Sequence, residues 1–374
     1  MERYGYIYEK VYDIENIKLA IKKSSLGKRE QKRVKKVLDN IDFYALKIQQ
    51  MLINKSYQPS QSDIKRIRDG ANKKDREIKK PKYFPDQIIH WALILQLEPI
   101  IMKGMYEYNC GSVPKRGTEY GRKTIRKWID RDKRNTKYCL KMDVTKFYPS
   151  VKGCILKQMF RNKIKDKDCL WLIDIIIDSE DGLPIGYYTS QWFSNFFLQG
   201  LDHFIKETLG VKYFVRYVDD LILMGSNKKK LHKVRKAVES YLESIGLKLK
   251  GNWQVFRISV RAIDFLGFRL FRDKTTLRKR NALRIMRRLR KIRKKGYLNC
   301  KDASAVISYW GWIKRSNSFY FYNKYIKPIV TIKLAKKVVS TNARIRNNQR
   351  QQTSEKRQAA YRLQINSVCR DTRI

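Results

Sequence analysis

The chain has 374 residues, of which 84 are lysine or arginine and 35 are acidic, and its formal net charge is +49. This excess predicts a polyanionic partner, with nucleic acid as the first candidate and a membrane surface as the second. There is no apolar run of 18 residues, which argues against a membrane-spanning helix. The six cysteines form no C-x-x-C pair and only three histidines are present, which argues against a zinc site.

The first third of the chain, residues 1–135, is predicted to be mostly helical and basic. Residues 14–53 carry apolar side chains at helical spacing among many lysines. Two prolines favour extended chain over residues 76–85, because proline disfavours a helix interior. A broad apolar stripe predicts a helix over residues 88–97, and residues 108–117 have the composition of a loop.

Residues 138–270 alternate between strand and helix signals. Apolar β-type runs predict strands, and amphipathic stretches that end at glycine predict helices. The predicted elements are a strand at 138–143, a helix at 190–209, two strands at 213–224, a helix at 227–245, and strands at 247–250 and 264–270. This order indicates an α+β layer with helices on one face of an antiparallel sheet.

The C-terminal part of the chain is strongly basic. Residues 278–295 contain eleven lysines and arginines and no acid, while Ala282, Met286, Leu289 and Ile292 recur at helical spacing. Such a helix can pack one face and keep the other cationic, and we favour a nucleic-acid-facing role over a solvated surface helix. Residues 331–374 are rich in lysine, arginine and glutamine and are expected to form a partly ordered basic tail.

Two groups of carboxylates follow strand-like apolar runs. Asp143 ends the first run, and Asp219-Asp220 lies between the two later strands. Each group alone is typical of a cap or a hairpin turn, but together they predict a site for hard cations. Joining a 3′-hydroxyl to a nucleoside triphosphate requires charge stabilisation, which two Mg²⁺ ions held by such carboxylates can supply.

Four motifs resemble those of reverse transcriptases, in the order and at the spacing typical of that family. Tyr217-Val218-Asp219-Asp220 resembles the Y-x-D-D box, and the segment 143–148 resembles the first palm aspartate motif. The segment 183–191 resembles the third palm-region signature, and 265–268 resembles the primer grip. The resemblance covers about residues 70 to 330.

The resemblance implies an α+β right-hand polymerase with helical fingers, an antiparallel-sheet palm and an α-helical thumb. The expected boundaries are an N-terminal region with fingers at 1–137, a palm at 138–272 that includes interleaved fingers elements, a thumb at 273–335 and a basic tail at 336–374. The cofactor implied is a pair of Mg²⁺ ions, with Mn²⁺ as a possible substitute. The partners implied are template RNA, the RNA/DNA hybrid and deoxynucleoside triphosphates.

The same resemblance implies roles for individual residues. Asp143, Asp219 and Asp220 are the expected catalytic residues, and these three with Val144 are the expected metal ligands. Tyr148 matches the ring under the sugar, although a core aromatic is an alternative, and Arg76 matches a triphosphate-gripping position for which Lys79, Lys80 and Lys82 compete. The palm lysine that meets the leaving group is Lys248 or Lys250. Further expected sites are Ile185, Gly186 and Gln191 for nucleotide binding, Leu266 and Gly267 for the primer grip, and Arg287, Arg288, Lys291, Lys294 and Lys295 for nucleic acid.

Two residues of the 183–191 segment depart from the commonest family pattern. Ile185 stands where most members have glutamine, and Gln191 stands where most have proline. This form is similar to that of diversity-generating retroelement enzymes, which implies error-prone copying at template adenines. Losing one hydrogen bond can erode discrimination between nucleotides, but Ile185 packing under the template with ordinary fidelity is the alternative.

Other interpretations stay open. Group II intron-like, retron and phage-defence reverse transcriptases are alternatives to the diversity-generating subclass. An inactive palm that serves as an RNA-binding protein would also explain the charge. A membrane-surface role fits poorly, because the basic helices carry ordinary core patterns. The resemblance further implies a possible small basic accessory protein and a cytoplasmic location in a bacterial or phage-encoded system.

Overall fold

The computed structural model describes residues 3–69 and 74–345, and the chain divides into two units, Met1–Arg261 and Ala262–Ile374. The division falls after Arg261, eleven residues before the expected palm boundary. Within the described ranges, no helix is both long and apolar enough to cross a membrane.

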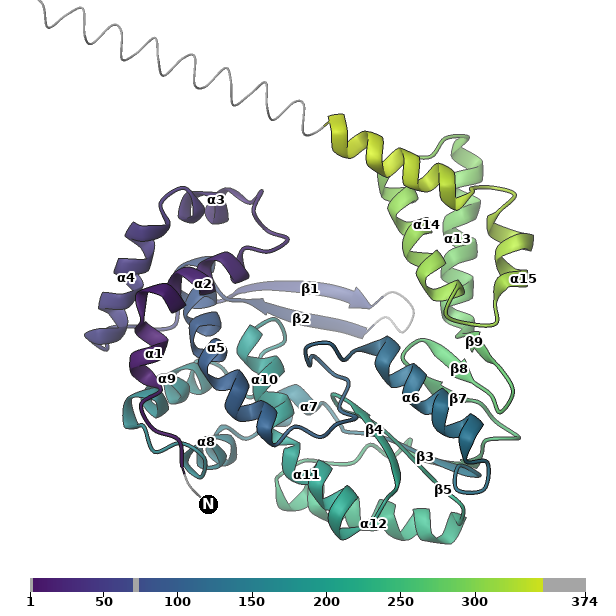
Figure 1. Cartoon of the computed structure of the whole chain (residues 1–374), viewed down its shortest axis with the longest axis horizontal. Helices are drawn as coiled ribbons and strands as arrows, with labels where there is room; N and C mark the ends of the chain where they lie inside the picture. The colour runs from purple at the N-terminus through teal and green to yellow at the C-terminus, as the bar shows by residue number, and fades with distance from the viewer. Residues whose placement is uncertain (1–2, 70–73, 346–374) are drawn as a thin grey trace, which may run out of the picture. The chain divides into compact units, whose positions relative to one another are not determined.

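The N-terminal unit begins with helices packed around a central apolar helix (Figure 1). The side chain of Asp13 caps one of them by accepting the backbone N–H groups of Glu15 and Asn16. Apolar side chains at helical spacing, such as Ile17, Ile21 and Ile48, are fully buried. The helices are α1 (Tyr8–Tyr12), α2 (Ile14–Ser24), α3 (Lys32–Leu38), α4 (Ile41–Ile53) and α5 (Ile88–Lys103).

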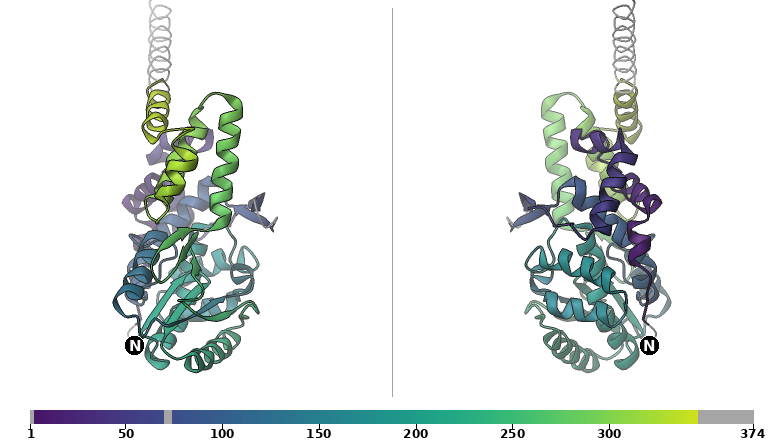
Figure 2. Two further views of the ribbon diagram at one scale, coloured as in Figure 1. Left: turned by 90° about the vertical axis from the view of Figure 1, so that its right-hand side faces the viewer. Right: turned by 90° about the vertical axis from the view of Figure 1, so that its left-hand side faces the viewer.

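A two-stranded hairpin projects from these helices, as both views in Figure 2 show. It consists of β1 (Asp63–Asp69) and β2 (Lys74–Lys80), which pair antiparallel with Asp63 opposite Lys80. Strand pairing in the expected extended segment 76–85 therefore ends at Lys80, although Lys82 and Phe84 keep extended backbone angles. Beyond it the chain enters a kinked turn, η1 (Tyr83–Gln87), which leads into α5.

A four-stranded antiparallel sheet forms the centre of this unit, with strand order β4-β5-β3-β6. Helix α12 packs against β3, β5 and β6, and α6 packs against β4. The strands are β3 (Tyr138–Asp143), β4 (Tyr213–Tyr217), β5 (Asp220–Gly225) and β6 (Gln254–Arg257), and the helices are α6 (Thr118–Arg131) and α12 (Lys228–Ser244). An antiparallel sheet with helices packed against it agrees with the expected α+β class.

The strand predicted at residues 247–250 is wrong. This segment makes a single bridge, between Leu249 and Val144, and the fourth strand is β6 instead. The backbone of Lys250 donates to the carbonyl of Asp143, and that of Thr145 donates to the carbonyl of Lys248, so the segment reaches only the end of β3. The alternating apolar residues of 247–250 are typical of a strand, but they do not indicate whether β3 is already paired with another strand.

The helix predicted at 190–209 is three consecutive pieces, α10 (Tyr188–Phe197), α11 (Gln199–His203) and η2 (Phe204–Thr208). Three residues of its predicted apolar stripe, Phe193, Phe197 and Leu201, are buried as expected. The remaining helices of the unit are α7 (Phe147–Ser150), α8 (Gly153–Arg161) and α9 (Lys167–Asp178).

The C-terminal unit contains a three-stranded antiparallel sheet and a basic helix. Its elements are β7 (Ile263–Phe265), β8 (Phe268–Leu270), β9 (Thr275–Leu277), α13 (Lys279–Lys295), α14 (Cys300–Ile313), α15 (Phe319–Phe321), η3 (Tyr322–Ile326) and a helix over 332–345. The single strand predicted at 264–270 is in fact the hairpin of β7 and β8. Its turn residues, Leu266 and Gly267, have φ angles of 51° and 88°, a backbone that a two-residue turn requires.

Helix α13 buries a slightly different stripe from the predicted one. Leu289 and Ile292 are buried as expected, but Ile285 is buried in the turn where Met286 was predicted. The start of the expected basic tail, residues 336–345, is helical, and the rest of the tail lies outside the described residues.

Candidate active site

Strand pairing brings the acidic residues of distant segments together. Asp143 ends β3 directly opposite Asp220 at the start of β5, and Tyr217 pairs with Asp220 from the other side. Val218 and Asp219 form the two-residue turn between β4 and β5. The backbone N–H of Val144 donates to the carbonyl of Asp219 (3.3 Å), which ties this turn to the end of β3.

The Asp143 carboxyl group lies close enough to Asp219 to affect the ionisation of the Asp219 carboxyl. Burial of Asp219, followed by the negative charge of Asp143, raises the pKa of the Asp219 carboxyl well above its usual range. Two carboxylates held together in a poorly solvated position repel each other. A cation between them would relieve that repulsion.

Two lysines pair with these acids. The Lys250 ammonium lies 3.0 Å from an Asp143 oxygen, and the Lys141 ammonium lies 3.6 Å from an Asp220 oxygen. The sequence left Lys248 and Lys250 as equal candidates for the lysine at the site. The structure brings Lys250 to the carboxylates, whereas the exposed Lys248 contributes its backbone carbonyl to Thr145.

The donor set fits a magnesium ion that also uses substrate oxygens. Over residues 3–69 and 74–345, no three acidic, histidine or cysteine side chains gather closely enough to form a complete metal site. The expected third carboxylate, Asp220, pairs with Lys141. Asp143 and Asp219 supply hard oxygen donors, and Mg²⁺ is commonly bound by one or two carboxylates together with phosphates and water.

The residues expected to bind nucleotide lie in β2, in α7, in the segment before α10 and in the first turn of α10. Ile185 is 36% exposed, and its carbonyl accepts the backbone N–H of Lys79 at 2.8 Å. Gly186 has a φ of +124°, and a Cβ at this position would lie 2.2 Å from the Lys79 carbonyl oxygen. This close approach requires glycine and anchors β2 to the segment.

The remaining three expected nucleotide-binding residues differ in exposure. Tyr148 is half-buried against the core, and burial raises the pKa of its hydroxyl while a hydrogen bond with Ser194 opposes that rise. Arg76 lies exposed in β2 opposite Ile67. Gln191 is exposed in the first turn of α10. The negative charge of Asp219 also contributes to the raised pKa of Tyr148.

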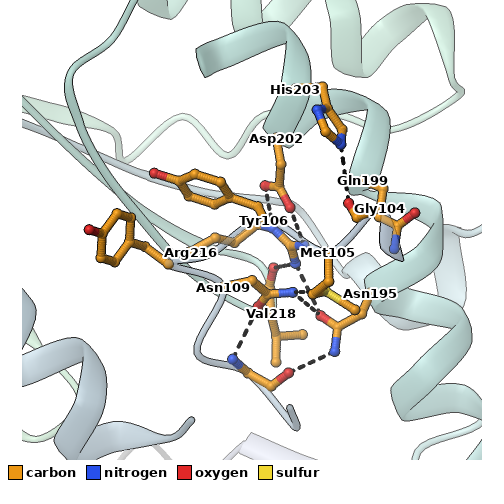
Figure 3. A network of polar contacts seen from close by, with 12 residues as sticks. Gly104, Met105, Tyr106, Asn109, Asn195, Gln199, Asp202, His203, Arg216 and Val218 are labelled. Atoms are coloured by element: carbon orange, nitrogen blue, oxygen red, sulfur yellow. Dashed lines mark hydrogen bonds and ion pairs between the residues drawn. The ribbon is translucent and has the colours of Figure 1, made fainter. Parts of the chain in front are cut away.

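A buried polar network that the sequence analysis missed contacts the Val218–Asp219 turn through the Val218 carbonyl (Figure 3). Arg216 is fully buried in β4 and makes a two-pronged ion pair with Asp202 of α11, at 2.7 and 2.6 Å. The same guanidinium donates to the Val218 carbonyl at 3.0 Å. The available signal was an arginine inside an otherwise apolar strand, directly before the Y-x-D-D box.

The sites expected in the C-terminal unit have their own contacts. The Gly267 carbonyl accepts the Asn281 side chain and the Arg278 backbone, which fixes the turn that contains Leu266. On α13, Arg288 and Lys295 pair with the buried Asp302 of α14, at 2.6 and 3.1 Å. Two of the five expected nucleic-acid contacts are thus engaged within the unit. The other three are exposed at helical spacing: Arg287, Lys291 and Lys294.

Comparisons with known proteins give a family match and several similar chains. Residues 71–270 match the family model described as reverse transcriptase (RNA-dependent DNA polymerase). The retron Ec73 reverse transcriptase of Escherichia coli is 27% identical over 205 residues, a match that covers 50% of this chain and 65% of that protein. Among solved structures, apo telomerase from Candida tropicalis (TM-score 0.43, covering 57% of this chain and 48% of that one) is 14% identical. Telomerase from Candida albicans (TM-score 0.43, covering 59% and 46%) is also 14% identical. The family match spans more than half of the sequence and contains both carboxylate motifs, so the chain belongs to the reverse transcriptase family.

Proposed function

We propose that this chain is an RNA-templated DNA polymerase whose nucleotidyl transfer takes place at Asp143 and Asp219. The observation that carries the proposal is the strand pairing that sets Asp143 against the Asp219-Asp220 turn within a reverse transcriptase family member. Template RNA and deoxynucleoside triphosphates are the assigned substrates. The net charge of +49 supports binding to both polyanions.

We assign metal binding to Asp143, Asp219 and the Val144 carbonyl, with Asp220 in support. Bound Mg²⁺ would stabilise the negative charge that develops on the transferring phosphate. We assign to Lys250, whose ammonium lies beside Asp143, the donation of a proton or a hydrogen bond to an oxygen of the departing pyrophosphate. By the same proposal, residues 1–137 contain the fingers, 138–272 the palm and 273–335 the thumb.

The Asp219→Asn variant tests the assignment. It should lose more than about nine-tenths of the Mg²⁺-dependent primer extension on poly(rA)/oligo(dT), because an amide binds a cation far less strongly than a carboxylate. RNA affinity should stay nearly unchanged. Asp178→Asn, an exposed aspartate that pairs with Lys157, is the matched control and should keep full activity.

Assays of the unmodified protein also distinguish the polymerase proposal from the alternative of an inactive RNA-binding protein. If the unmodified protein binds RNA but incorporates no nucleotide with Mg²⁺ or Mn²⁺, the RNA-binding interpretation is correct. If Asp219→Asn retains more than about a tenth of the activity, the metal role of Asp219 is wrong.

We further propose the diversity-generating subclass, with error-prone copying of template adenines. The support is Ile185, whose half-exposed apolar side chain stands where most members carry an amide. A retron function is the second candidate, and the similarity to the retron Ec73 enzyme favours it. That match covers 50% of this chain.

Fidelity measurements distinguish these two candidates. Ile185→Gln should lower misincorporation opposite template adenine by roughly 10-fold, since one well-placed polar contact is worth about that much discrimination. Ile185→Val, which keeps an apolar branched side chain, is the control and should leave the error spectrum unchanged. If the unmodified enzyme copies adenine as faithfully as the other bases, the diversity-generating proposal fails and the retron candidate remains.

A further inference from the structure

The buried Arg216 side chain contacts both an acid and the turn that presents Asp219. Its Nε and Nη2 atoms donate to the two carboxylate oxygens of Asp202, and both side chains have no solvent exposure. Its Nη1 atom donates to the Val218 carbonyl at 3.0 Å and to the Asn195 side-chain oxygen at 3.3 Å. Asp202 thus fixes the Arg216 guanidinium through two nitrogens, and the third nitrogen donates to the turn at the Val218 carbonyl (Figure 3).

The turn needs such support because its backbone is strained. Val218 has a φ of +56°, a left-handed conformation that β-branched residues disfavour. Two-residue hairpin turns usually place glycine or asparagine at such a position. The Val218 carbonyl belongs to the peptide that leads into Asp219, so a donor fixed on this oxygen also fixes the start of the Asp219 residue.

A loop over residues 109–111, far from the turn in the sequence, packs against the same turn and the residues that contact it. Asn195 accepts the Asn109 side chain at 3.0 Å and donates to the Gly111 carbonyl at 2.7 Å. Cys110 donates its backbone N–H to the Arg216 carbonyl at 2.8 Å. A Cβ on Gly111 would lie 2.5 Å from the Val218 nitrogen, so only glycine allows the loop to pass so close to the turn.

We propose that Arg216, held by Asp202 and Asn195, is a positioning residue that sets the Asp219 carboxylate for metal binding. The inference rests on the proposed polymerase function. An ion pair that served only to fill the core would need no donor on the Val218 carbonyl, and apolar residues of similar volume could replace it. The guanidinium instead uses two nitrogens for Asp202 and a third for the Val218 carbonyl, a spacing that an ammonium, with all its donors on one nitrogen, does not provide.

The test compares two variants at the network with one matched control. Arg216→Lys keeps a charge beside Asp202 but cannot reach Asp202, Asn195 and Val218 together. The double variant Arg216→Met/Asp202→Leu keeps an apolar volume and leaves no buried charge, in case Arg216→Lys fails to fold. Tyr213→Phe is the control, because it removes one hydrogen bond, to Asp132 at 2.7 Å, from the opposite end of the same strand β4.

Three measurements are made on the full chain. Hydrogen exchange of the segment 217–220 reports the order of the turn without any substrate. Thermal unfolding reports stability. Direct Mn²⁺ titration of the protein reports metal binding, and steady-state primer extension reports kcat separately.

We expect faster exchange at 217–220 and weaker Mn²⁺ binding in both network variants. We also expect a roughly 100-fold loss of kcat, because a displacement of about 1 Å at a reacting group has this effect. RNA affinity should change less than 2-fold. Tyr213→Phe should show neither the faster exchange at 217–220 nor the loss of kcat, whatever its change in unfolding temperature.

Unchanged exchange at 217–220, or a loss of kcat no larger than that of Tyr213→Phe at an equal change in unfolding temperature, would overturn the proposal. An inactive unmodified protein would refute the polymerase function instead. The exchange and Mn²⁺ measurements would still decide whether Arg216 positions the turn.

Discussion

At the scale of single residues, the two lysines near the end of β3 have different neighbours. Lys250 contacts Asp143 at 3.0 Å through its ammonium, whereas Lys248 is exposed and reaches this region through its backbone. The two residues have the same side chain and lie two positions apart. They therefore form a matched pair for mutation.

Lys250→Ala should lower kcat for nucleotide incorporation by roughly 100-fold, in the range usual for the loss of a positioned proton donor. Lys248→Ala should change kcat by less than about 3-fold, because its backbone hydrogen bond is retained. Single-nucleotide primer extension at saturating triphosphate measures both. The reverse ranking would show that Lys248 is the lysine that serves the reaction.

At the scale of elements, the β1–β2 hairpin depends on its contact with the segment before α10. The Lys79 backbone donates to Ile185, the Lys79 ammonium pairs with Glu180, and Gly186 lies against the Lys79 carbonyl. These contacts join β2 to the residues expected to face the incoming nucleotide. A change at Gly186 should therefore affect both stability and nucleotide binding.

Gly186→Ala should destabilise the protein by about 1–3 kcal/mol, because its Cβ would overlap the Lys79 carbonyl in a backbone conformation that alanine disfavours. The KM for deoxynucleoside triphosphate should rise at the same time. Gly251→Ala is the control, since a Cβ there meets no atom within 4 Å, and it should change stability by about 0.5 kcal/mol or less. Urea unfolding and steady-state kinetics check both. Equal effects of the two variants would contradict the close packing of β2.

A second junction between elements depends on Asp166. Its carboxylate accepts the backbone N–H groups of Ile7 and Tyr8 in the N-terminal segment, and of Asp168 and Cys169 in α9. Burial acts to raise the pKa of Asp166, but these four backbone donors outweigh it and lower the pKa below its usual value. The ionised carboxylate therefore stabilises the folded state. This stabilisation is present above the unfolded-state pKa of about 3.9 and is lost as the pH falls through the lower folded-state pKa.

Asp166→Ala should cost about 1–2 kcal/mol of stability at pH 7, and this cost should shrink as the pH falls below about 4. Asn227→Ala is the control. Asn227 caps α12 through an amide that does not titrate in this range, so its cost should be the same at both pH values. Denaturant unfolding at pH 7 and pH 3 measures the difference. A cost for Asp166→Ala that does not depend on pH would contradict the ionised cap.

At the scale of the whole molecule, the net charge of +49 predicts binding to RNA that weakens steeply with salt. Charge alone does not say which surface makes the contacts. Arg287, Lys291 and Lys294 are exposed on α13, whereas Arg288 and Lys295 are engaged with Asp302. A comparison at constant net charge can separate the position of the charges from their number.

Replacing Arg287, Lys291 and Lys294 by glutamine should reduce the slope of log K against log salt concentration by about 2–3, since each phosphate contact contributes about 0.7–0.9. The same replacement of the exposed Lys228, Lys229 and Lys233 on α12 is the control and should reduce the slope by less than about 1. RNA binding measured at several salt concentrations checks the difference. Equal slopes in the two variants would show that α13 is not a preferred contact surface.

The sequence was sufficient where the signal is local. Asp143 and Asp219-Asp220 were recognisable because each follows an apolar strand, and α12 was recognisable because its apolar residues recur at helical spacing. The order of the four motifs was sufficient for the family. The roles of these acids as metal ligands stay predictions.

Only the tertiary structure decided the contacts between distant segments. It selected Lys250 over Lys248 at Asp143, replaced the strand predicted at 247–250 with β6, and showed that Arg216 holds the turn before Asp219. Periodicity records which face of an element is apolar, but not which partner that face meets. A buried arginine is stable only because Asp202 and Asn195 come to it from other parts of the chain, and no local pattern encodes that meeting.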